Sequence, residues 1–95
     1  MNESNPSDAA LAELLTLTME VDEYGDTRYR NHLGQFHRIH GPAVIYSDGC
    51  EDWFQNGLLH REDGPAVIVN DGRKYWYFNN EFLTEQEWNE RIQSL

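Results

Sequence analysis

Histidine is the residue type in this sequence that most invites a chemical interpretation. The four histidines are His32, His37, His40 and His60, and two of them, at 37 and 40, have a spacing that metal ligands use. However, the sequence offers no cysteine pair to complete a zinc site. His37 and His60 also occupy the same position of a repeated pattern, which indicates a structural role such as a hydrogen bond to the backbone. We therefore predict neither a metal site nor a cofactor.

The other reactive side chains lack the neighbours that catalysis needs. Cys50 lies in a predicted turn, and the second copy of the repeat has Arg73 in its place, so the pattern supplies no base to activate a thiol. Adjacent carboxylates at 51–52 and 62–63 fall on predicted turns and strand starts, with no sign of the enclosure that raises a pKa. The sequence predicts that the protein is not an enzyme.

A 23-residue pattern that is written twice organises the chain. The copies run from Gly34 to Asn56 and from Gly57 to Asn79, and 12 of their 23 positions are identical. The identical pairs are Gly34/Gly57, His37/His60, Arg38/Arg61, Gly41 to Ile45 against Gly64 to Ile68, Asp48/Asp71, Gly49/Gly72, Trp53/Trp76 and Asn56/Asn79. A fixed period of this length marks one supersecondary unit per copy.

Each copy predicts a β-meander. Ala43–Tyr46 and Ala66–Val69 are short apolar runs rich in Val and Ile, which favour strands. An Asp-Gly pair follows each run, as in tight hairpin turns. A second strand then carries Trp53 or Trp76, and the first of these strands leads into the Asn-Gly pair at 56–57, a strong hairpin signal.

The pattern G-x-x-H-R-x-D-G-P-A, followed by an apolar strand, Asp-Gly, Trp and Asn, resembles the tandem HRxDGPA repeats of small phage and bacterial proteins, which are loosely similar to MORN-type repeats. The resemblance covers about residues 34–83. The second copy matches the pattern from His60 to Asn79, whereas the first copy departs from it at His40, where the family has an acidic residue, and at Ser47. The resemblance implies a fold of β-hairpin repeats and a phage origin, and it implies no active site.

The N-terminal part predicts a short helix and a hairpin. Asn5 and Pro6 are typical of a helix start, and a short apolar stripe follows them up to Leu15. Strict alternation from 15 to 22 then predicts a strand that buries Leu17, Met19 and Val21. A turn at Gly25 and Asp26 leads to a returning strand at 27–31. We interpret this hairpin as a degenerate copy of the repeat that caps the sheet.

The C-terminal part predicts a helix with a well-specified start. Thr84 and Glu87 form the pattern of a capping box, and Leu83 and Trp88 that of a hydrophobic staple. Replacing Thr84 by Ala is expected to cost about 1 kcal/mol of stability. Trp88 and Ile92, four residues apart, give the helix one apolar face to lay against the sheet.

The predicted fold class is α+β and mainly β. It is an antiparallel β-meander of about six strands, built from the two repeats and the degenerate N-terminal hairpin and flanked by a short N-terminal and a C-terminal helix. We assign residues 1–95 to a single domain, with the acidic helix and capping hairpin at 1–33, the two repeats at 34–79 and a C-terminal strand and helix at 80–95.

The net charge of −10 is confined to the two flanks. Residues 1–27 hold seven acidic and no basic residues (−7), residues 28–80 hold six of each (0), and residues 81–95 hold four acidic residues and one arginine (−3). Binding to phosphate groups needs a patch of basic residues, so we do not expect the protein to bind nucleic acid directly. An acidic surface attracts basic proteins instead.

Two surfaces are candidates for binding a partner. The acidic one is the N-terminal hairpin with Glu20, Asp22, Glu23 and Asp26, which is equally typical of a solvated edge strand that charge protects from pairing. The aromatic one is the sheet face that carries Phe54, Tyr75 and Tyr77, opposite Trp53 and Trp76. Its alternative is a second minor core under a terminal segment.

Two classes of function remain. The first is a non-catalytic binding protein, such as a phage-encoded inhibitor (an anti-CRISPR or similar anti-defence factor) whose acidic surface blocks a basic nucleic-acid-binding site on a host protein. The second is a structural or assembly module that binds through its aromatic sheet face. The single cysteine, and the lack of a secretory or membrane-length apolar run, favour the cytoplasm, which is the host cytoplasm for a phage protein.

Overall fold

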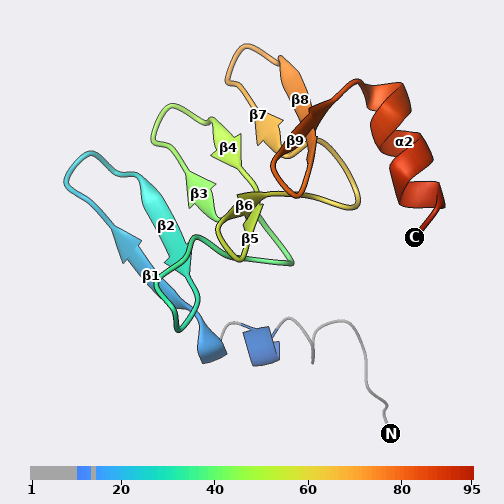
Figure 1. Ribbon diagram of the computed structural model, residues 1–95. Coiled ribbons are helices and arrows are strands. Elements are labelled where there is room, and N and C mark those ends of the chain that lie inside the picture. The colour runs from blue at the N-terminus through green and yellow to red at the C-terminus, as the bar shows by residue number, and fades with distance from the viewer. Residues whose placement is uncertain (1–10, 14) are drawn as a thin grey trace, which may run out of the picture.

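The computed structural model describes residues 11–13 and 15–95, which form a long antiparallel sheet with a helix at its C-terminal end (Figure 1). The strands are β1 (Thr18–Val21), β2 (Thr27–Arg30), β3 (Val44–Ile45), β4 (Glu51–Asp52), β5 (Phe54–Gln55), β6 (Leu58–Leu59), β7 (Val67–Ile68), β8 (Lys74–Phe78) and β9 (Glu81–Leu83), followed by helix α2 (Glu85–Gln93). Residues 11–13 and 15–16 are helical. Seven strands form one sheet in the order β1-β2-β3-β4-β7-β8-β9, and β5 and β6 pair separately. The predicted helix start at Asn5 and Pro6 lies outside the described residues.

Three hairpins, β1–β2, β3–β4 and β7–β8, stand side by side with their tips along one edge of the sheet (Figure 1). Val44 pairs with Asp52 in the second hairpin, and Val67 pairs with Tyr75 in the third, so the register repeats after 23 residues. The tip glycines have φ angles of 85°, 96° and 95°, a conformation that disfavours any residue with a Cβ. The predicted Asp-Gly turns are confirmed.

The chain leaves this sheet at Trp53, which makes the strands more numerous and shorter than predicted. The Trp53 N–H donates to the Ala66 carbonyl in the main sheet (2.7 Å), whereas its carbonyl accepts from the His60 N–H (3.0 Å). The chain therefore turns into the separate hairpin β5–β6 instead of continuing along β4. The expected antiparallel meander is found, with seven strands instead of about six, and in the described part of the chain a separate two-stranded hairpin lies beside it.

Arginine side chains cover the aromatic rings at this bend. The Arg61 guanidinium lies 3.7 Å from the centroid of the Trp53 ring, and that of Arg38 lies 4.1 Å from the centroid of the Tyr29 ring. Both guanidinium groups donate to a proline carbonyl four residues later in the chain. A Cβ on Gly64 would lie 2.8 Å from Arg61 Cζ, so the glycine of the motif leaves room for the stacked arginine.

Helix α2 follows the last strand of the sheet. Its predicted capping box is confirmed: the Thr84 hydroxyl accepts from the Glu87 N–H (3.1 Å), and the Glu87 carboxylate accepts from the Thr84 N–H (2.9 Å). The bond from the Thr84 backbone lowers the pKa of Glu87. Leu83 and Trp88, the two predicted staple residues, are both buried. The helix therefore begins where the sequence places it and packs against β8 and β9.

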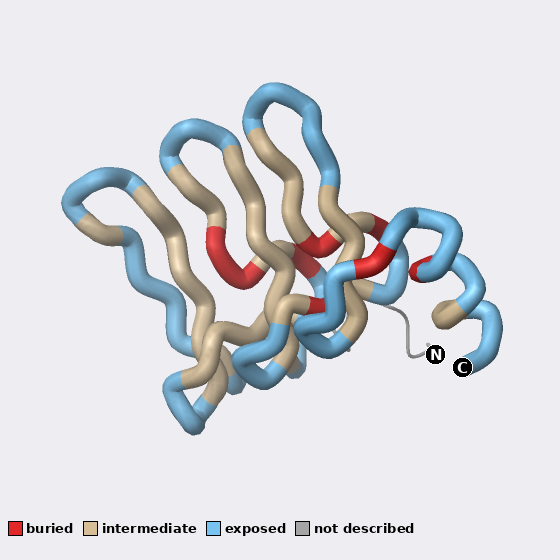
Figure 2. The backbone as a smooth tube through the Cα atoms, turned by 45° about the horizontal axis from the view of Figure 1, so that its top comes forward, coloured by how far each residue is buried: buried red, intermediate tan, exposed pale blue. Residues whose placement is uncertain are grey.

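The buried segments lie at the bases of the hairpins and beside helix α2, and the hairpin tips are exposed (Figure 2). The buried apolar residues are Ala43, Val44, Ala66, Leu83 and Trp88. Trp53 and Trp76 are half-buried, the first beneath the Arg61 guanidinium and the second against the Trp88 ring. The prediction that β1 buries its apolar residues is wrong: Met19 is 58% and Val21 56% exposed, because no described element covers this edge strand.

Candidate functional site

The repeated histidines hold turns together. His37 Nδ1 accepts the Asn56 N–H (2.9 Å), and His60 Nδ1 accepts the Asn79 N–H (3.0 Å), in both cases 19 residues later in the chain. Because Nδ1 of His60 is an acceptor, its proton sits on Nε2, which bonds to the Glu62 carboxylate (2.8 Å). Among the described residues, no three His, Cys, Asp or Glu side chains gather closely enough to hold a metal ion.

The two repeated arginines differ in their acidic partner. Arg61 Nε donates to Asp63 (2.7 Å). In the first copy His40 occupies the position of Asp63, and the buried Nε of Arg38 finds no hydrogen-bond partner in the described part of the chain. The departure from the repeat pattern at His40 therefore leaves one polar atom unsatisfied.

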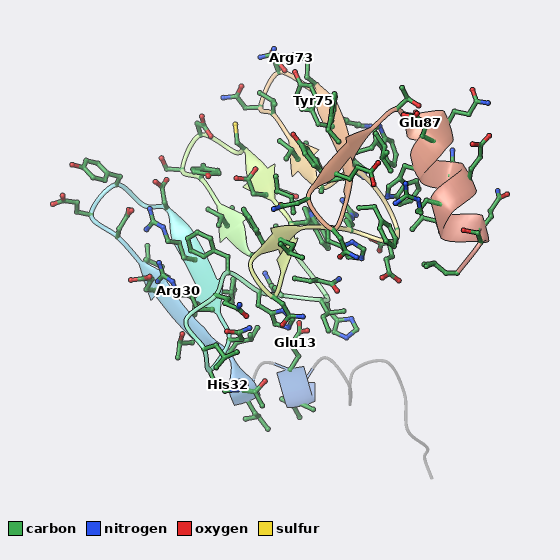
Figure 3. All side chains as sticks on the ribbon, viewed as in Figure 1. Glu13, Arg30, His32, Arg73, Tyr75 and Glu87 are labelled. Atoms are coloured by element: carbon green, nitrogen blue, oxygen red, sulfur yellow. The ribbon has the colours of Figure 1, made fainter. Side chains whose placement is uncertain are left out.

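Glu13 bonds to the loop that contains His40. Its carboxylate accepts the backbone N–H groups of Ile39 (2.8 Å) and His40 (3.1 Å), and Figure 3 shows its side chain pointing from the helical residues towards this part of the sheet. The matching loop of the second copy carries Glu62 and Asp63, whose charges would repel a third carboxylate. The acidic N-terminal segment is thus fastened to the neutral loop of the first copy.

The four acids of the predicted acidic site all lie on hairpin β1–β2, with Glu20 on β1 and the other three at the tip. Glu20 forms an ion pair with Arg30, and Asp22 with Arg28 (2.7 Å). The Arg28 hydrogen bond lowers the pKa of Asp22, so this carboxylate is ionised. Both Glu20 and Arg30 are partly exposed, and Figure 3 marks the position of Arg30 on β2.

Two of these acids also support the backbone. Asp22 accepts the N–H groups of Tyr24 and Asp26, and Asp26 accepts the N–H of Ser47 (2.8 Å), which links the first tip to the second. The alternative of a merely solvated edge strand therefore does not describe Asp22 and Asp26. Glu23 is exposed at the tip, and no ion pair involves it within the described residues.

Most of the positive charge is neutralised inside the molecule. Of the seven basic residues, five are ion-paired with the protein's own acids: Arg28, Arg30, Arg61, Arg73 and Arg91. Arg38 is stacked on Tyr29, and Lys74 is exposed on β8. The exposed acids Glu23, Asp48, Glu85 and Glu90 make no ion pair within the described part of the chain. The outward potential is therefore set by carboxylates.

The prediction that the adjacent carboxylates at 51–52 and 62–63 are not enclosed is wrong for Asp52. It lies half-buried in β4, between Val44 and Val67 on the neighbouring strands, and accepts the hydroxyl of Tyr46 (2.8 Å). Burial raises the pKa of Asp52 above its ordinary value, although the Tyr46 bond opposes this. Burial and the bond to Asp52 raise the pKa of Tyr46 to about 12.

The predicted aromatic site divides into two clusters. Tyr77 and Tyr75 lie beside Phe82, with ring centroids 5.4 Å and 6.1 Å away. Phe54 instead packs on Phe36, at 5.4 Å. Phe82 is 62% exposed, and Figure 3 shows Tyr75 on β8 near the hairpin tip with Arg73. Sequence reasoning missed Phe82 and Phe36, although the repeat register places both in the position of Leu59.

A cleft and a thiol complete the inventory of reactive groups. The cleft has a volume of about 280 Å³ and is lined by Ile39, His40, Gln55, Arg61, Glu62 and Asp63. Its acidic groups are already bonded to His60 and Arg61. At Cys50 the Asn70 backbone lowers the thiol pKa, but the bond to Asp48 and partial burial outweigh it and leave that pKa raised, so the thiol stays protonated.

Fold and surface define the class: a mainly antiparallel β-sheet protein with a C-terminal helix and an acidic exterior. Comparison with known protein families, with curated proteins and with solved structures found no match to this chain. No helix of the described residues combines the length and the apolar character that crossing a membrane requires.

Proposed function

We propose that this protein is a non-catalytic binding protein whose acidic surface occupies a basic, nucleic-acid-binding site on another protein. The observation that carries the proposal is the internal pairing of five of the seven basic residues, which leaves carboxylates to dominate the exposed charge. Such a surface repels nucleic acid and attracts proteins that bind it. An inhibitor that blocks the nucleic-acid-binding site of a host effector needs such a surface. An anti-CRISPR or similar anti-defence factor encoded by a phage is an inhibitor of this kind.

The hairpin tips of the first two hairpins are the proposed contact. Glu23 and Asp48 are exposed there, and the bond from Ser47 N–H to Asp26 holds the two tips together. The Cys50 backbone N–H bonds to the Asp48 carboxylate and lowers its pKa, so the charge persists at mildly acidic pH. Opposite charges across an interface chiefly raise the association rate, and each exposed pair contributes little alone.

The proposal that the protein has no catalytic activity rests on the state of its reactive groups. The thiol of Cys50 has a raised pKa, and the histidines at 37 and 60 use Nδ1 to accept backbone N–H groups. Asp52 lies at the end of β4, between two neighbouring strands, with a tyrosine as its partner. None of these groups adjoins a second group that would make it a nucleophile or a general base.

The test uses a partner captured from a native host lysate and then purified. Binding is measured for wild type and for the double variant Glu23→Gln/Asp48→Asn, at low and high salt. We expect the variant to bind about tenfold or more weakly at low salt, with the difference shrinking as salt screens the charges. Nucleic acid that uses the partner's basic groove should displace the wild-type protein.

The matched control is Glu85→Gln/Glu90→Gln on the exposed side of α2. It changes the net charge by the same amount at the other end of the molecule, so it should alter affinity by less than about threefold. Equal losses in both variants would mean that net charge acts without a specific contact. If neither variant lost affinity and nucleic acid did not compete, the acidic contact would be wrong.

A second candidate is assembly through the aromatic sheet face. The observation in its favour is the exposed ring of Phe82, flanked by Tyr75 and Tyr77. Rings of this kind are typical of interaction surfaces. Binding through this face should be insensitive to salt and should fail in Phe82→Ser, whereas the acidic contact has the opposite dependence.

We also propose that the N-terminal hairpin is a third, degenerate copy of the repeat. Tyr29 occupies the place of Trp53: it donates to Ala43 as Trp53 does to Ala66, and it carries Arg38 on its ring. The offset is 24 rather than 23 residues, which agrees with a loop after Arg30 that is one residue longer. This reading supports the likeness to HRxDGPA, MORN-like hairpin repeats.

A further inference from the structure

Strand β1 is the open edge of the seven-stranded sheet. Its inner edge pairs with β2, and in the described part of the chain no strand lies against its outer edge. All four of its residues are exposed. The other end of the sheet differs, because α2 packs on β8 and β9 there. Natural sheets block or use their edges, and none of the elements in the described ranges covers this one.

The backbone groups that point outward belong to the exposed apolar residues. The Asp22 N–H donates to the Asp26 carbonyl within the hairpin, and hydrogen-bonded pairs alternate along an antiparallel ladder. Glu20↔Arg28 is therefore a hydrogen-bonded pair, whereas Met19↔Tyr29 and Val21↔Thr27 are not. The Tyr29 N–H indeed points away from β1 and donates to the carbonyl of Ala43, the residue before β3. Met19 and Val21 thus direct their N–H and C=O groups to the free edge.

The sequence of β1 is complementary to itself. When a second β1 is turned by 180° about an axis through Met19, that residue lies opposite its own copy and Leu17 lies opposite Val21. In the same register Thr18 lies opposite Glu20, so no like charges face each other. The outward backbone groups of the two strands then meet, and the exposed apolar side chains share one face of the joined sheet.

Neighbouring registers are worse. A shift of two residues in one direction places Glu20 opposite its own copy, where like charges oppose pairing. The shift in the other direction places Val21 opposite Leu15, which is helical. A shift of one residue would set outward groups against inward ones. One register is therefore selected.

We propose that β1 pairs with the β1 of a second copy of this chain, in a two-fold dimer whose sheets join into one. The contact uses the same edge of both copies, so it closes at two and leaves no further open edge of this kind. An edge pairing of this length belongs to the small end of interfaces, and we expect a dimer Kd of the order of 10–100 µM. The inference does not rest on the proposed function.

The dependence of binding on salt distinguishes the proposed dimer from the proposed acidic contact with a partner. Each copy carries a net charge of −10, so screening should strengthen the dimer, whereas it should weaken the acidic contact with a basic partner. Sedimentation of wild type from about 1 µM to about 1 mM, at about 0.05 M and about 0.5 M NaCl, measures this. Wild type that stays monomeric throughout would overturn the dimer, and species that grow beyond two would overturn its symmetry.

Substitutions at the edge test the register. Met19→Lys places two positive charges opposite each other at the axis and should raise the dimer Kd at least tenfold. Thr18→Lys places a cation opposite Glu20 and should lower it. Circular dichroism and thermal melting show whether each variant keeps the fold. Unchanged self-association in folded Met19→Lys would contradict the proposal.

Cross-linking gives a second, independent readout. In a Cys50→Ser background, Met19→Cys places two thiols in a hydrogen-bonded antiparallel pair, whose Cα atoms lie about 5.5 Å apart and suit a disulfide. Mild oxidation should therefore convert Met19→Cys to a covalent dimer. The matched control is Phe82→Cys, exposed at the opposite end of the sheet, which should cross-link far more slowly. Equal rates for the two variants would refute the pairing.

Discussion

The ring of Trp88 lies on the ring of Trp76, with centroids 4.7 Å apart, in the place where Arg61 lies on Trp53. The Trp88 indole N–H also donates to the Arg61 carbonyl (2.9 Å), so the helix is fastened to the second repeat loop. The C-terminal helix thus supplies the cover that a following repeat would supply through its arginine. This is how the series of hairpins ends without leaving the Trp76 ring uncovered.

Trp88→Ala should lower the free energy of unfolding by about 3–5 kcal/mol, because it removes a large buried side chain. Trp88→Phe keeps an aromatic ring on Trp76 but leaves the Arg61 carbonyl without its donor, and should cost about 1–3 kcal/mol. Denaturant unfolding provides the measurement, and exposed Gln86→Ala in the same helix is the control. An unchanged midpoint in Trp88→Ala would mean that α2 does not stabilise the sheet.

Gly64→Ala should cost about 1–3 kcal/mol, since the new Cβ would lie 2.8 Å from Arg61 Cζ and displace the stacked guanidinium. The cost should fall when Arg61 is also replaced by Ala, because the new Cβ then has no guanidinium group to clash with. A double-mutant cycle measured by denaturant unfolding tests this coupling. Additive effects of the two substitutions would show that the glycine is needed for another reason.

His40→Asp should stabilise the protein by about 0.5–1.5 kcal/mol. The new carboxylate stands where Asp63 receives Arg61 Nε, and it gives the unsatisfied Nε of Arg38 a partner. The Glu13 carboxylate is bonded to the same loop, so its charge should reduce the gain. Comparing His40→Asp with and without Glu13→Gln, by thermal and denaturant unfolding, separates the two effects. Destabilisation in both backgrounds would count against the repeat equivalence of His40 and Asp63.

Local signals predicted the turns and the helix start well, because each depends on a few adjacent residues. The Asp-Gly tips, the Asn-Gly turn at 56–57 and the capping box of Thr84 and Glu87 are all found where the sequence places them. The asparagines at 79 and 80 both adopt positive φ, and the Asn80 side chain accepts the Leu59 N–H in addition, which offsets the strain. The hydrogen-bonding role of the repeated histidines also followed from their position.

Features that depend on neighbouring strands could not be predicted. Alternation marks Met19 and Val21 as one face of a strand, but it cannot tell whether another element covers that face. The stacking of Arg38 and Arg61 on aromatic rings needs the bend at Trp53, which arises from a change of hydrogen-bond partner far along the chain. For the same reason the sequence places the four acids on one hairpin but does not reveal their bonds to Arg28, Arg30 and Ser47.

Asp52→Asn should stabilise the protein near neutral pH and lose that advantage in acid. Burial raises the pKa of Asp52 above its ordinary value of 3.8, so the fold prefers the protonated form. The stability that this carboxyl group contributes is complete below pH 3.8 and is lost as pH rises through the raised pKa. Asn keeps an acceptor for the Tyr46 hydroxyl without the charge. The gain should be a fraction of a kcal/mol, because Asp52 is only half-buried.

Denaturant unfolding of wild type and Asp52→Asn, at about pH 3 and about pH 7, measures the effect. The control is Asp48→Asn, because the hydrogen bond from the Cys50 backbone lowers the pKa of Asp48 and reverses the sign. Asp48→Asn should therefore lose stability relative to wild type as pH rises from the lowered pKa of Asp48 to the ordinary value of 3.8, and this loss is complete at neutral pH. If Asp52→Asn were less stable than wild type at neutral pH and equal to it in acid, the charged hydrogen bond to Tyr46 would outweigh burial, and the carboxylate would be a stabilising element of the sheet.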